Sequence, residues 1–248
     1  MKILLEDNWT YDGEADDIIE YSKINNIECI ILNKNELLQL DSCYFLENIY
    51  FCNTEIVQYH LKNTNRGDLI PDTYDKRFHD LYHRTIEKMS ILEFKNKYNG
   101  ITNKFIKPCG NDKYFDGRLI NNLTDFELYG VDIPEDNLMI YCCEPMDIIA
   151  EVRLLVGNHK IYGYGHMSIT IIDNFYQDEL FIKKLFECIE NDYLCVDIGY
   201  IYDKTNNIFR WVVIEINPPF SLDDYDISFN QYINFCIDVC KYINQKIK

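Results

Sequence analysis

Short apolar or alternating runs recur from Phe105 onward, and they constrain the fold more than any other feature of the sequence. Runs of this length that are bounded by turn-forming residues are typical of β-strands. They lie at residues 105–106, 126–129, 138–142, 152–156, 161–164, 195–202 and 210–216. We therefore expect a strand-rich region that forms an antiparallel sheet, interrupted by one helix near residues 179–190.

The first part of the chain has a different pattern, which predicts a small α/β lobe with a partly parallel sheet. Its apolar runs lie at residues 2–5, 27–32 and 49–52, with helical spacing at 15–25 and 55–61. Beyond this part, helical spacing recurs at residues 79–90 and, as a closing helix, at 225–247. Turn-forming residues around Pro71 indicate a lobe boundary. The sequence thus predicts an α+β protein with an N-terminal lobe of residues 1–70 and a larger unit of residues 71–248.

Composition limits the possible partners. The net charge of −17 over 248 residues argues against broad contact with nucleic acid or an anionic membrane, although a nucleotide in a local pocket is allowed. No run approaches the ~18 apolar residues that cross a bilayer, and Glu6 and Asp7 interrupt any signal-peptide core. We expect a soluble cytoplasmic protein. Heavy use of Asn, Ile, Lys and Tyr indicates an A+T-rich genome such as that of a virus or parasite, and a viral protein would lie in the host cytoplasm.

The segment 212–219 is the most informative for chemistry. It is an apolar strand whose alternation places Glu215 and Asn217 on one face, just before two prolines end it. Mg²⁺ prefers oxygen ligands combined with substrate phosphates over a full protein cage, so this carboxylate and amide suit it. A strand that merely exposes one polar face would show the same pattern.

Asp197 lies inside another apolar run, where an unpaired carboxylate would be costly. A hairpin between this strand and the next would bring Asp197 close to Glu215 and Asn217. The group could hold one or two metal ions, or Asp197 could belong to a structural salt bridge.

Two basic residues could face a phosphate. Lys107 follows an apolar strand, and its ammonium is a compact charge suited to a phosphate, or it could simply be solvated. Glu151 and Arg153 share one face of a later strand. Arg153 could clamp a phosphoryl group or pair with Glu151 at the surface.

Taken in order, Lys107-Pro, Glu151-x-Arg153, Asp197 and Glu215-x-Asn217-Pro resemble the ATP-grasp superfamily, closest to ribosomal-protein glutamylating ligases and short phage- or virus-type members. The resemblance covers residues 107–218. It implies an ATP-grasp fold in which a small N-terminal α/β lobe precedes two sheet-bearing lobes that sandwich ATP. The lid would be formed by residues from about 100 to 145, and the metal-binding lobe by residues from about 146 to 248.

The resemblance also implies a role for each matching residue. Lys107, Glu151 and Arg153 would be catalytic and would contact ATP, at the phosphates, near the ribose or catalytic centre, and near the γ-phosphate respectively. The hinge whose backbone meets adenine would span residues 140–144, with Cys142, Cys143 and Glu144 as the nucleotide contacts. The Mg²⁺ ligands would be Asp197, Glu215 and Asn217, for one or two ions that Mn²⁺ could replace. His166 lies where relatives often carry a basic residue near the substrate.

The implied activity is ATP-dependent ligation of a carboxylate to an amine through an acyl-phosphate, with release of ADP and phosphate. The acceptor could be a peptide, a protein or a metabolite. A small-molecule kinase of the same fold and a non-catalytic nucleotide-binding module are alternatives. Two departures from the family pattern are the single Gly117 in the phosphate flap at residues 111–118, and Pro219-Phe220-Ser221 in place of Pro-Gly. Oligomeric state is left open by the sequence.

Overall fold

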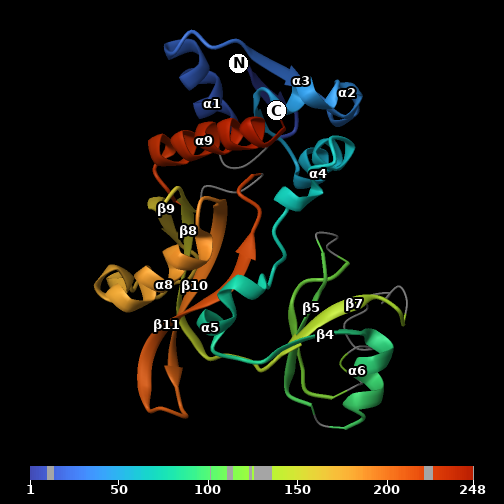
Figure 1. The fold of residues 1–248 in the computed structure, drawn as a ribbon, viewed down its shortest axis with the longest axis vertical. Helices are drawn as coiled ribbons and strands as arrows, with labels where there is room; N and C mark the ends of the chain where they lie inside the picture. The colour runs from blue at the N-terminus through green and yellow to red at the C-terminus, as the bar shows by residue number, and fades with distance from the viewer. Residues whose placement is uncertain are drawn as a thin grey trace.

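The computed structural model describes residues 1–9, 14–100, 102–110, 114–122, 125, 136–220 and 226–247, which form an α+β fold with three separate sheets (Figure 1). The sheet of the N-terminal lobe is parallel, in the order β2-β1-β3. Its strands are β1 (Ile3–Glu6), β2 (Cys29–Leu32) and β3 (Ile49–Phe51), and its helices are α1 (Glu14–Ile24), α2 (Lys34–Gln39), α3 (Ser42–Leu46) and α4 (Thr54–Asn63). The predicted α/β lobe is therefore present, and its described sheet is wholly parallel.

The C-terminal helix α9 (Phe229–Ile247) packs against this lobe although it is the last element of the chain. Figure 1 shows it in red between the N-terminal lobe and the ends of β8 and β9. Its buried face includes Phe235, Val239 and Ile243, which join the same core as Leu4 and Phe51. The N-terminal lobe is thus completed by residues from the C-terminal part of the sequence.

A second sheet, antiparallel in the order β11-β10-β8-β9, forms the C-terminal lobe. Its strands are β8 (Ile148–Gly157), β9 (Lys160–His166), β10 (Tyr193–Asp203) and β11 (Ile208–Asn217). One face packs on an apolar core shared with α8 (Glu179–Ile189), α5 (His79–Tyr82) and the 3₁₀ turns η2 (Lys76–Phe78) and η3 (Asn174–Gln177). The other face is therefore left for α9 at one end and for the lid at the other.

The third sheet, which we call the lid, is antiparallel in the order β4-β7-β5-β6 and begins at residue 86, before the lid expected at about 100–145. Its strands are β4 (Ile86–Ser90), β5 (Lys104–Pro108), β6 (Arg118–Ile120) and β7 (Met139–Cys143). Helix α6 (Ile91–Lys97) begins at a capping box, because Ser90 and Glu93 each bond the other's backbone N–H. Ile91 and Phe94 of this helix pack on Ile106 and Ile140 and cover one face of the sheet.

Several expectations from the sequence are wrong or untested. The predicted helix at residues 79–90 stops at Tyr82, since His83 adopts a left-handed conformation (φ 49°), and Ile86–Ser90 pairs with β7 instead. The strand-rich region, which the apolar runs alone predicted as an antiparallel sheet, divides into two antiparallel sheets, as the family resemblance implied. The run at residues 126–129 lies outside the described residues. The helices α2, α3 and α6 were not predicted.

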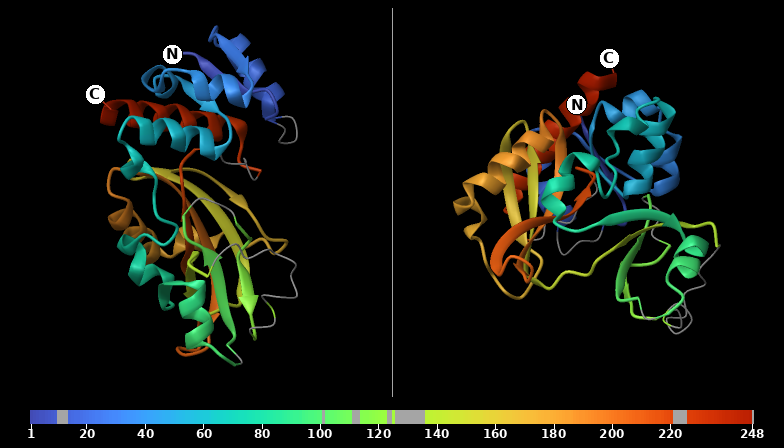
Figure 2. Two further views of the ribbon diagram at one scale, coloured as in Figure 1. Left: turned by 90° about the vertical axis from the view of Figure 1, so that its right-hand side faces the viewer. Right: turned by 60° about the horizontal axis from the view of Figure 1, so that its bottom comes forward.

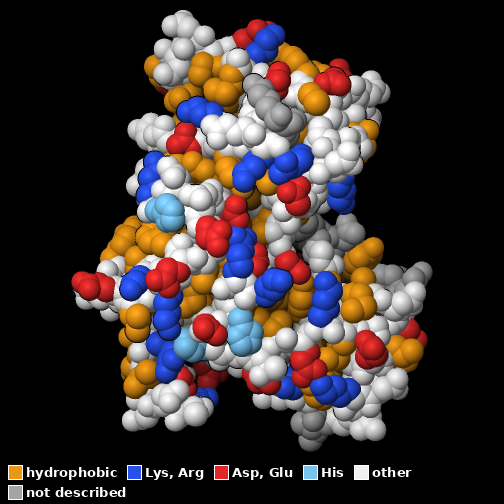
Figure 3. Space-filling view, viewed as in Figure 1, with side chains coloured by type: hydrophobic (Ala, Val, Ile, Leu, Met, Phe, Trp, Pro, Cys, Tyr) orange, Lys and Arg blue, Asp and Glu red, His pale blue; other side chains and the backbone are white. Residues whose placement is uncertain are grey.

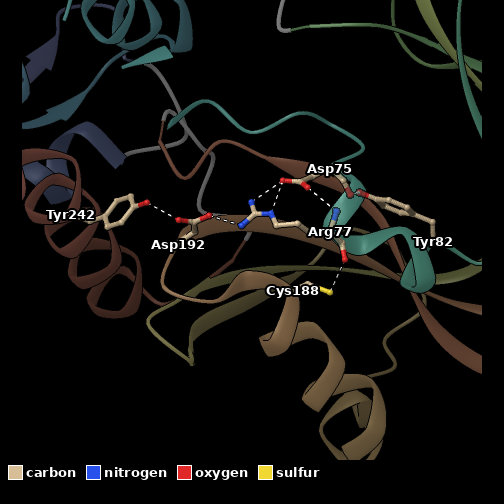
Figure 4. Close-up of polar contacts among 6 residues, drawn as sticks. All are labelled: Asp75, Arg77, Tyr82, Cys188, Asp192 and Tyr242. Carbon is tan, nitrogen blue, oxygen red and sulfur yellow. Dashed lines mark hydrogen bonds and ion pairs between the residues drawn. The ribbon is translucent and has the colours of Figure 1, made fainter. Parts of the chain in front are cut away.

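Residues 70–85 form a connecting segment between the N-terminal lobe and the lid. A polar network joins this segment to α8 and, through Asp192, to α9 (Figure 4). The Arg77 guanidinium donates twice to Asp75 Oδ2, at 2.9 and 2.8 Å, and once to Asp192 Oδ2 at 2.6 Å. Asp192 in turn accepts a 2.7 Å bond from the Tyr242 hydroxyl of α9, and the Cys188 thiol donates to the Arg77 carbonyl. The segment after η1 (Gly67–Leu69) is thereby fixed against α8 and α9.

Charge is distributed without a broad basic surface on the face shown in Figure 3, where acidic and basic side chains are interspersed. None of the described helices combines the length and apolar character required to span a bilayer.

Candidate active site

The lid sheet and the C-terminal sheet meet at a junction that the chain crosses twice, between α5 and β4 and between β7 and β8 (Figure 2, right). Ile106 of β5 points into the lid core against α6, so its neighbour Lys107 points to the opposite face, toward the C-terminal sheet. The Lys107 ammonium donates to Glu215 Oε2 of β11. This contact joins residues 108 positions apart and brings the predicted phosphate lysine to the predicted metal ligands.

Glu215 is held on both sides. Its other oxygen, Oε1, accepts a 3.2 Å bond from Asn217 Nδ2, as expected for residues two apart on one strand face. Burial by itself would raise the pKa of Glu215, but the Lys107 ammonium and the Asn217 amide hold it below its ordinary value. The carboxylate is therefore ionised at neutral pH and suited to a cation.

Asp197 and Arg153 form the buried centre of the site. In the sheet, Asp197 lies opposite Glu215 on one side and opposite Arg153 on the other, so all three side chains share one face. Arg153 Nε and Nη2 donate to the two Asp197 oxygens, each at 2.7 Å, and Asn217 Nδ2 adds a bond of 2.9 Å. Burial raises the pKa of Asp197, although the Arg153 guanidinium opposes the shift. The structure thus shows the salt bridge considered for Asp197, and its partner is Arg153.

Glu151 is two residues before Arg153 and lies opposite Gly199. Its expected partner Arg153 makes a bidentate ion pair with Asp197. Burial raises the pKa of Glu151 to about 7, and repulsion from Asp197 and Glu215 adds to the shift. A carboxyl group with such a pKa can exchange a proton near neutral pH.

The predicted adenine contacts, residues 142–144, lie where β7 leaves the lid toward β8. Cys142 packs in the lid core with its side chain, so only its backbone could meet a ligand. The Glu144 carboxylate accepts bonds from Lys104 Nζ at 2.9 Å and from the Thr85 backbone N–H at 3.0 Å. Beside it lies a cavity of about 350 Å³, lined by residues 83–85, 144–147 and 201–204. The predicted adenine contact thus borders an accessible pocket.

The residues present fit Mg-ATP. The described part of the chain has no cluster of three or more His, Cys, Asp or Glu side chains that could enclose a metal ion. Asp197, Glu215 and Asn217 offer instead an incomplete set of oxygen donors, which is what Mg²⁺ uses when phosphates complete its shell. The Asn217 amide now donates to both carboxylates, and it would have to turn its oxygen toward a bound cation.

Sequence reasoning missed two residues at the junction and misplaced a third. Arg84 contacts the Ile214 carbonyl of β11, the Glu144 carbonyl of the hinge and the Tyr74 hydroxyl, but it lay in a stretch interpreted as helix. His166 lies opposite Val152, whose side chain is in the core shared with α8, so it is on the other face of the sheet from Arg153. Strand pairing, which decides both points, has no local signal.

Known structures share this architecture. D-alanine–D-alanine ligase from Bacillus anthracis has a TM-score of 0.60 at 9% identity over 100% of both chains. A RimK domain ATP-grasp protein from Sphaerobacter thermophilus gives 0.56 at 13% identity, over 99% of this chain and 98% of that one. N5-carboxyaminoimidazole ribonucleotide synthetase from Thermotoga maritima gives 0.56 at 16%, over 96% and 76%. These likenesses confirm the expected ATP-grasp fold.

No curated protein matches the chain in sequence. The profile of the ATP-grasp domain of R2K clade family 2 matches residues 81–235, which is more than half of the chain and contains every predicted site residue. From this match and the shared fold, the chain belongs to the ATP-grasp domain family 2 of the R2K clade.

Proposed function

We propose that this protein is an Mg-ATP-dependent carboxylate–amine ligase that releases ADP and phosphate. The observation that carries the proposal is the convergence of separate chain segments at the lobe junction. The Lys107 ammonium, the Arg153 guanidinium and the oxygens of Asp197 and Glu215 lie in one connected set of contacts. Membership in an ATP-grasp family supports ATP as the nucleotide.

The chemistry follows from the charges. A substrate carboxylate oxygen attacks the γ-phosphorus, the bond to the β-phosphate oxygen breaks, and ADP leaves an acyl-phosphate behind. The amine then attacks the acyl carbon, phosphate departs with the electron pair, and the amine loses a proton. Lys107 and Arg153 would neutralise the phosphoryl oxygens, and a Mg²⁺ ion held by Asp197, Glu215 and Asn217 would add further positive charge.

A covalent enzyme intermediate is not needed. The cysteines near the junction are poor nucleophiles, because burial raises the pKa of Cys142 to about 11 and that of Cys109 to about 11. Thiols with such values are almost wholly protonated at neutral pH, and the thiolate is the reactive form. This favours direct transfer between substrates over transfer through the protein.

Hydroxylamine trapping tests the proposal. The protein is incubated with Mg-ATP, hydroxylamine and a panel of amino acids and dipeptides, and both ADP and ferric hydroxamate are measured. We expect hydroxamate and ADP in equal amounts for at least one carboxylate. Lys107→Gln should abolish both, whereas Lys95→Gln, which alters an exposed lid lysine paired with Asp136, should not.

The alternatives give distinct results. ADP formation that requires a hydroxyl compound and yields no hydroxamate would identify a kinase and refute ligation. ATP binding without turnover on any carboxylate would identify a non-catalytic nucleotide-binding module.

A further inference from the structure

We infer that Arg84 is a positioning residue for β11, the strand that carries the proposed metal ligands. It fixes the position of Glu215 relative to the hinge. This inference rests on the proposed function, since it concerns the same site. Arg84 contacts β11, the connecting segment and the hinge with one guanidinium. Its Nη2 donates to the Ile214 carbonyl at 3.1 Å and to the Tyr74 hydroxyl at 3.2 Å, and Nη1 reaches the Glu144 carbonyl at 3.5 Å.

The contact with Ile214 falls at a break in the sheet. Asp197 is opposite Glu215, but the next residue, Ile198, is opposite Val213, so Ile214 is an extra residue in β11. Such a bulge disrupts the ladder and re-aims the neighbouring side chain. The Ile214 carbonyl immediately precedes the Glu215 backbone, so the position of this carbonyl sets the direction of the metal carboxylate.

The outer edge of β11 makes hydrogen bonds to the connecting segment at the residues before and after Glu215. β11 is the outer strand of its sheet, so its outward backbone groups lack a strand partner among the described residues. The Ile216 N–H donates to the Thr73 carbonyl at 2.9 Å, and the Ile214 carbonyl accepts from Arg84. The connecting segment therefore supplies one donor and one acceptor to the edge, and Glu215 lies between them.

Arg84 is itself anchored by aromatic contacts. Its guanidinium carbon lies 5.4 Å from the centre of the Tyr74 ring, and Tyr74 packs edge-on against Tyr141 of β7 at 4.9 Å. Burial raises the pKa of Tyr74, so its hydroxyl remains neutral and can accept the arginine bond. The guanidinium is thereby oriented from the lid side as well as from the metal strand.

Stability alone does not account for this arginine. The Arg84 Nε–H is buried and has no hydrogen-bond partner among the described residues. A buried unpaired donor costs free energy that a smaller apolar side chain would avoid. Retaining the guanidinium at this cost fits a residue that is needed for geometry.

Arg84→Met and Arg84→Lys test the inference, with Arg77→Met as the matched control. Arg77 lies on the same segment and is also anchored by polar contacts, but it touches Asp75 and Asp192 rather than the junction. The first readout is amide hydrogen exchange at residues 214–217 without ligand. The second is the affinity for Mn²⁺-ATP by calorimetry. Neither requires turnover.

We expect Arg84→Met to accelerate exchange at residues 214–217 at least ~10-fold and to weaken Mn²⁺-ATP binding about 10–100-fold, the usual cost of losing an outer partner of a metal ligand. Arg84→Lys, which can reach one carbonyl but not both, should be intermediate and keeps the test open if the methionine variant does not fold. Arg77→Met should lower stability and leave both readouts unchanged.

Unchanged exchange at residues 214–217, equal effects in the Arg77 control, or unaltered Mn²⁺-ATP affinity would each overturn the inference. A wild-type protein that binds Mn²⁺-ATP but gives no hydroxamate would refute the proposed ligation alone. A wild-type protein that binds no Mn²⁺-ATP would overturn both.

Discussion

Arg153 and Lys107 each contact a carboxylate at the junction, and the two ion pairs differ in solvent exposure. The side chains of Arg153 and Asp197 are 9% and 1% exposed, whereas those of Lys107 and Glu215 are 26% and 18% exposed. A deeply buried pair adds little net stability compared with apolar residues, yet removing one partner is costly because the other charge remains buried. The Lys107 pair, which is nearer solvent, can exchange partners more cheaply.

Arg153→Met should therefore lower the free energy of unfolding by about 3–5 kcal/mol, because Asp197 is left buried without its cation. The double variant Arg153→Met/Asp197→Leu should recover most of this loss while remaining unable to turn over ATP. Urea denaturation at neutral pH measures both. A loss below about 1 kcal/mol in the single variant would contradict the expected cost of leaving Asp197 buried without Arg153.

Glu151 gives a pH dependence of stability with a defined sign. Its folded pKa of about 7 exceeds the ordinary glutamate value, so the folded protein binds this proton more tightly than the unfolded chain. The resulting stability is fully present below the unfolded pKa and is lost as pH rises through about 7. In metal-free protein, we expect wild type to lose stability relative to Glu151→Gln between about pH 5 and pH 8. Parallel urea midpoints for the two proteins would contradict this.

At the scale of elements, helix α4 is held to α2 and α3 by one buried histidine. His60 Nε2 lies 3.0 Å from the Leu37 carbonyl, which can only accept, so Nε2 carries the proton and Nδ1 accepts from the Ser42 hydroxyl at 2.9 Å. The ring stacks on Phe45 with centroids 4.0 Å apart. Burial lowers the pKa of His60, so the folded lobe favours the neutral ring.

The N-terminal lobe should consequently lose stability in acid. The unfolded chain binds the His60 proton near pH 6.5, so the stability from neutral His60 is present above that pH and is lost as pH falls below it. His60→Gln should be less stable at pH ~7.5 but should show a smaller further loss at pH ~5.5. Thermal denaturation at both values measures the difference, and an equal loss in both proteins would exclude His60 as the cause.

For the whole molecule, the lid is joined to the C-terminal lobe by two chain crossings and by contacts such as Lys107–Glu215. This ion pair places the proposed phosphate lysine on a proposed metal ligand. Binding Mg-ATP would replace one pairing with two, since Lys107 would contact phosphate and Glu215 would contact the metal. Lid position and nucleotide binding are therefore expected to be coupled.

Small-angle scattering should show this coupling. Without nucleotide, Lys107→Gln should have a larger radius of gyration than wild type and Lys95→Gln, because the lid loses a contact across the junction. Saturating Mg-ATP should raise the stability of wild type, by about 4 kcal/mol at 1,000 times Kd. A Lys107→Gln protein that is as compact as wild type would show that other contacts alone set the lid position.

Local pattern alone determined much of this protein. The alternation in residues 212–217 placed Glu215 and Asn217 on one strand face, and both amide contacts confirm it. The apolar run around Asp197 predicted a buried carboxylate that needs a partner, which the structure provides. These inferences hold because side-chain direction along a strand and the cost of burying charge depend on a few neighbouring residues.

Only the tertiary structure decided which groups meet. Strand register pairs Arg153 with Asp197 and places His166 on the sheet face away from the site. The bulge in β11 exposes the Ile214 carbonyl to Arg84. A shift of one residue moves every side chain to the other face of a sheet, and nothing in the local sequence sets that register. Helix and strand spacing are likewise ambiguous over residues 79–90, where pairing with β7 selects the strand.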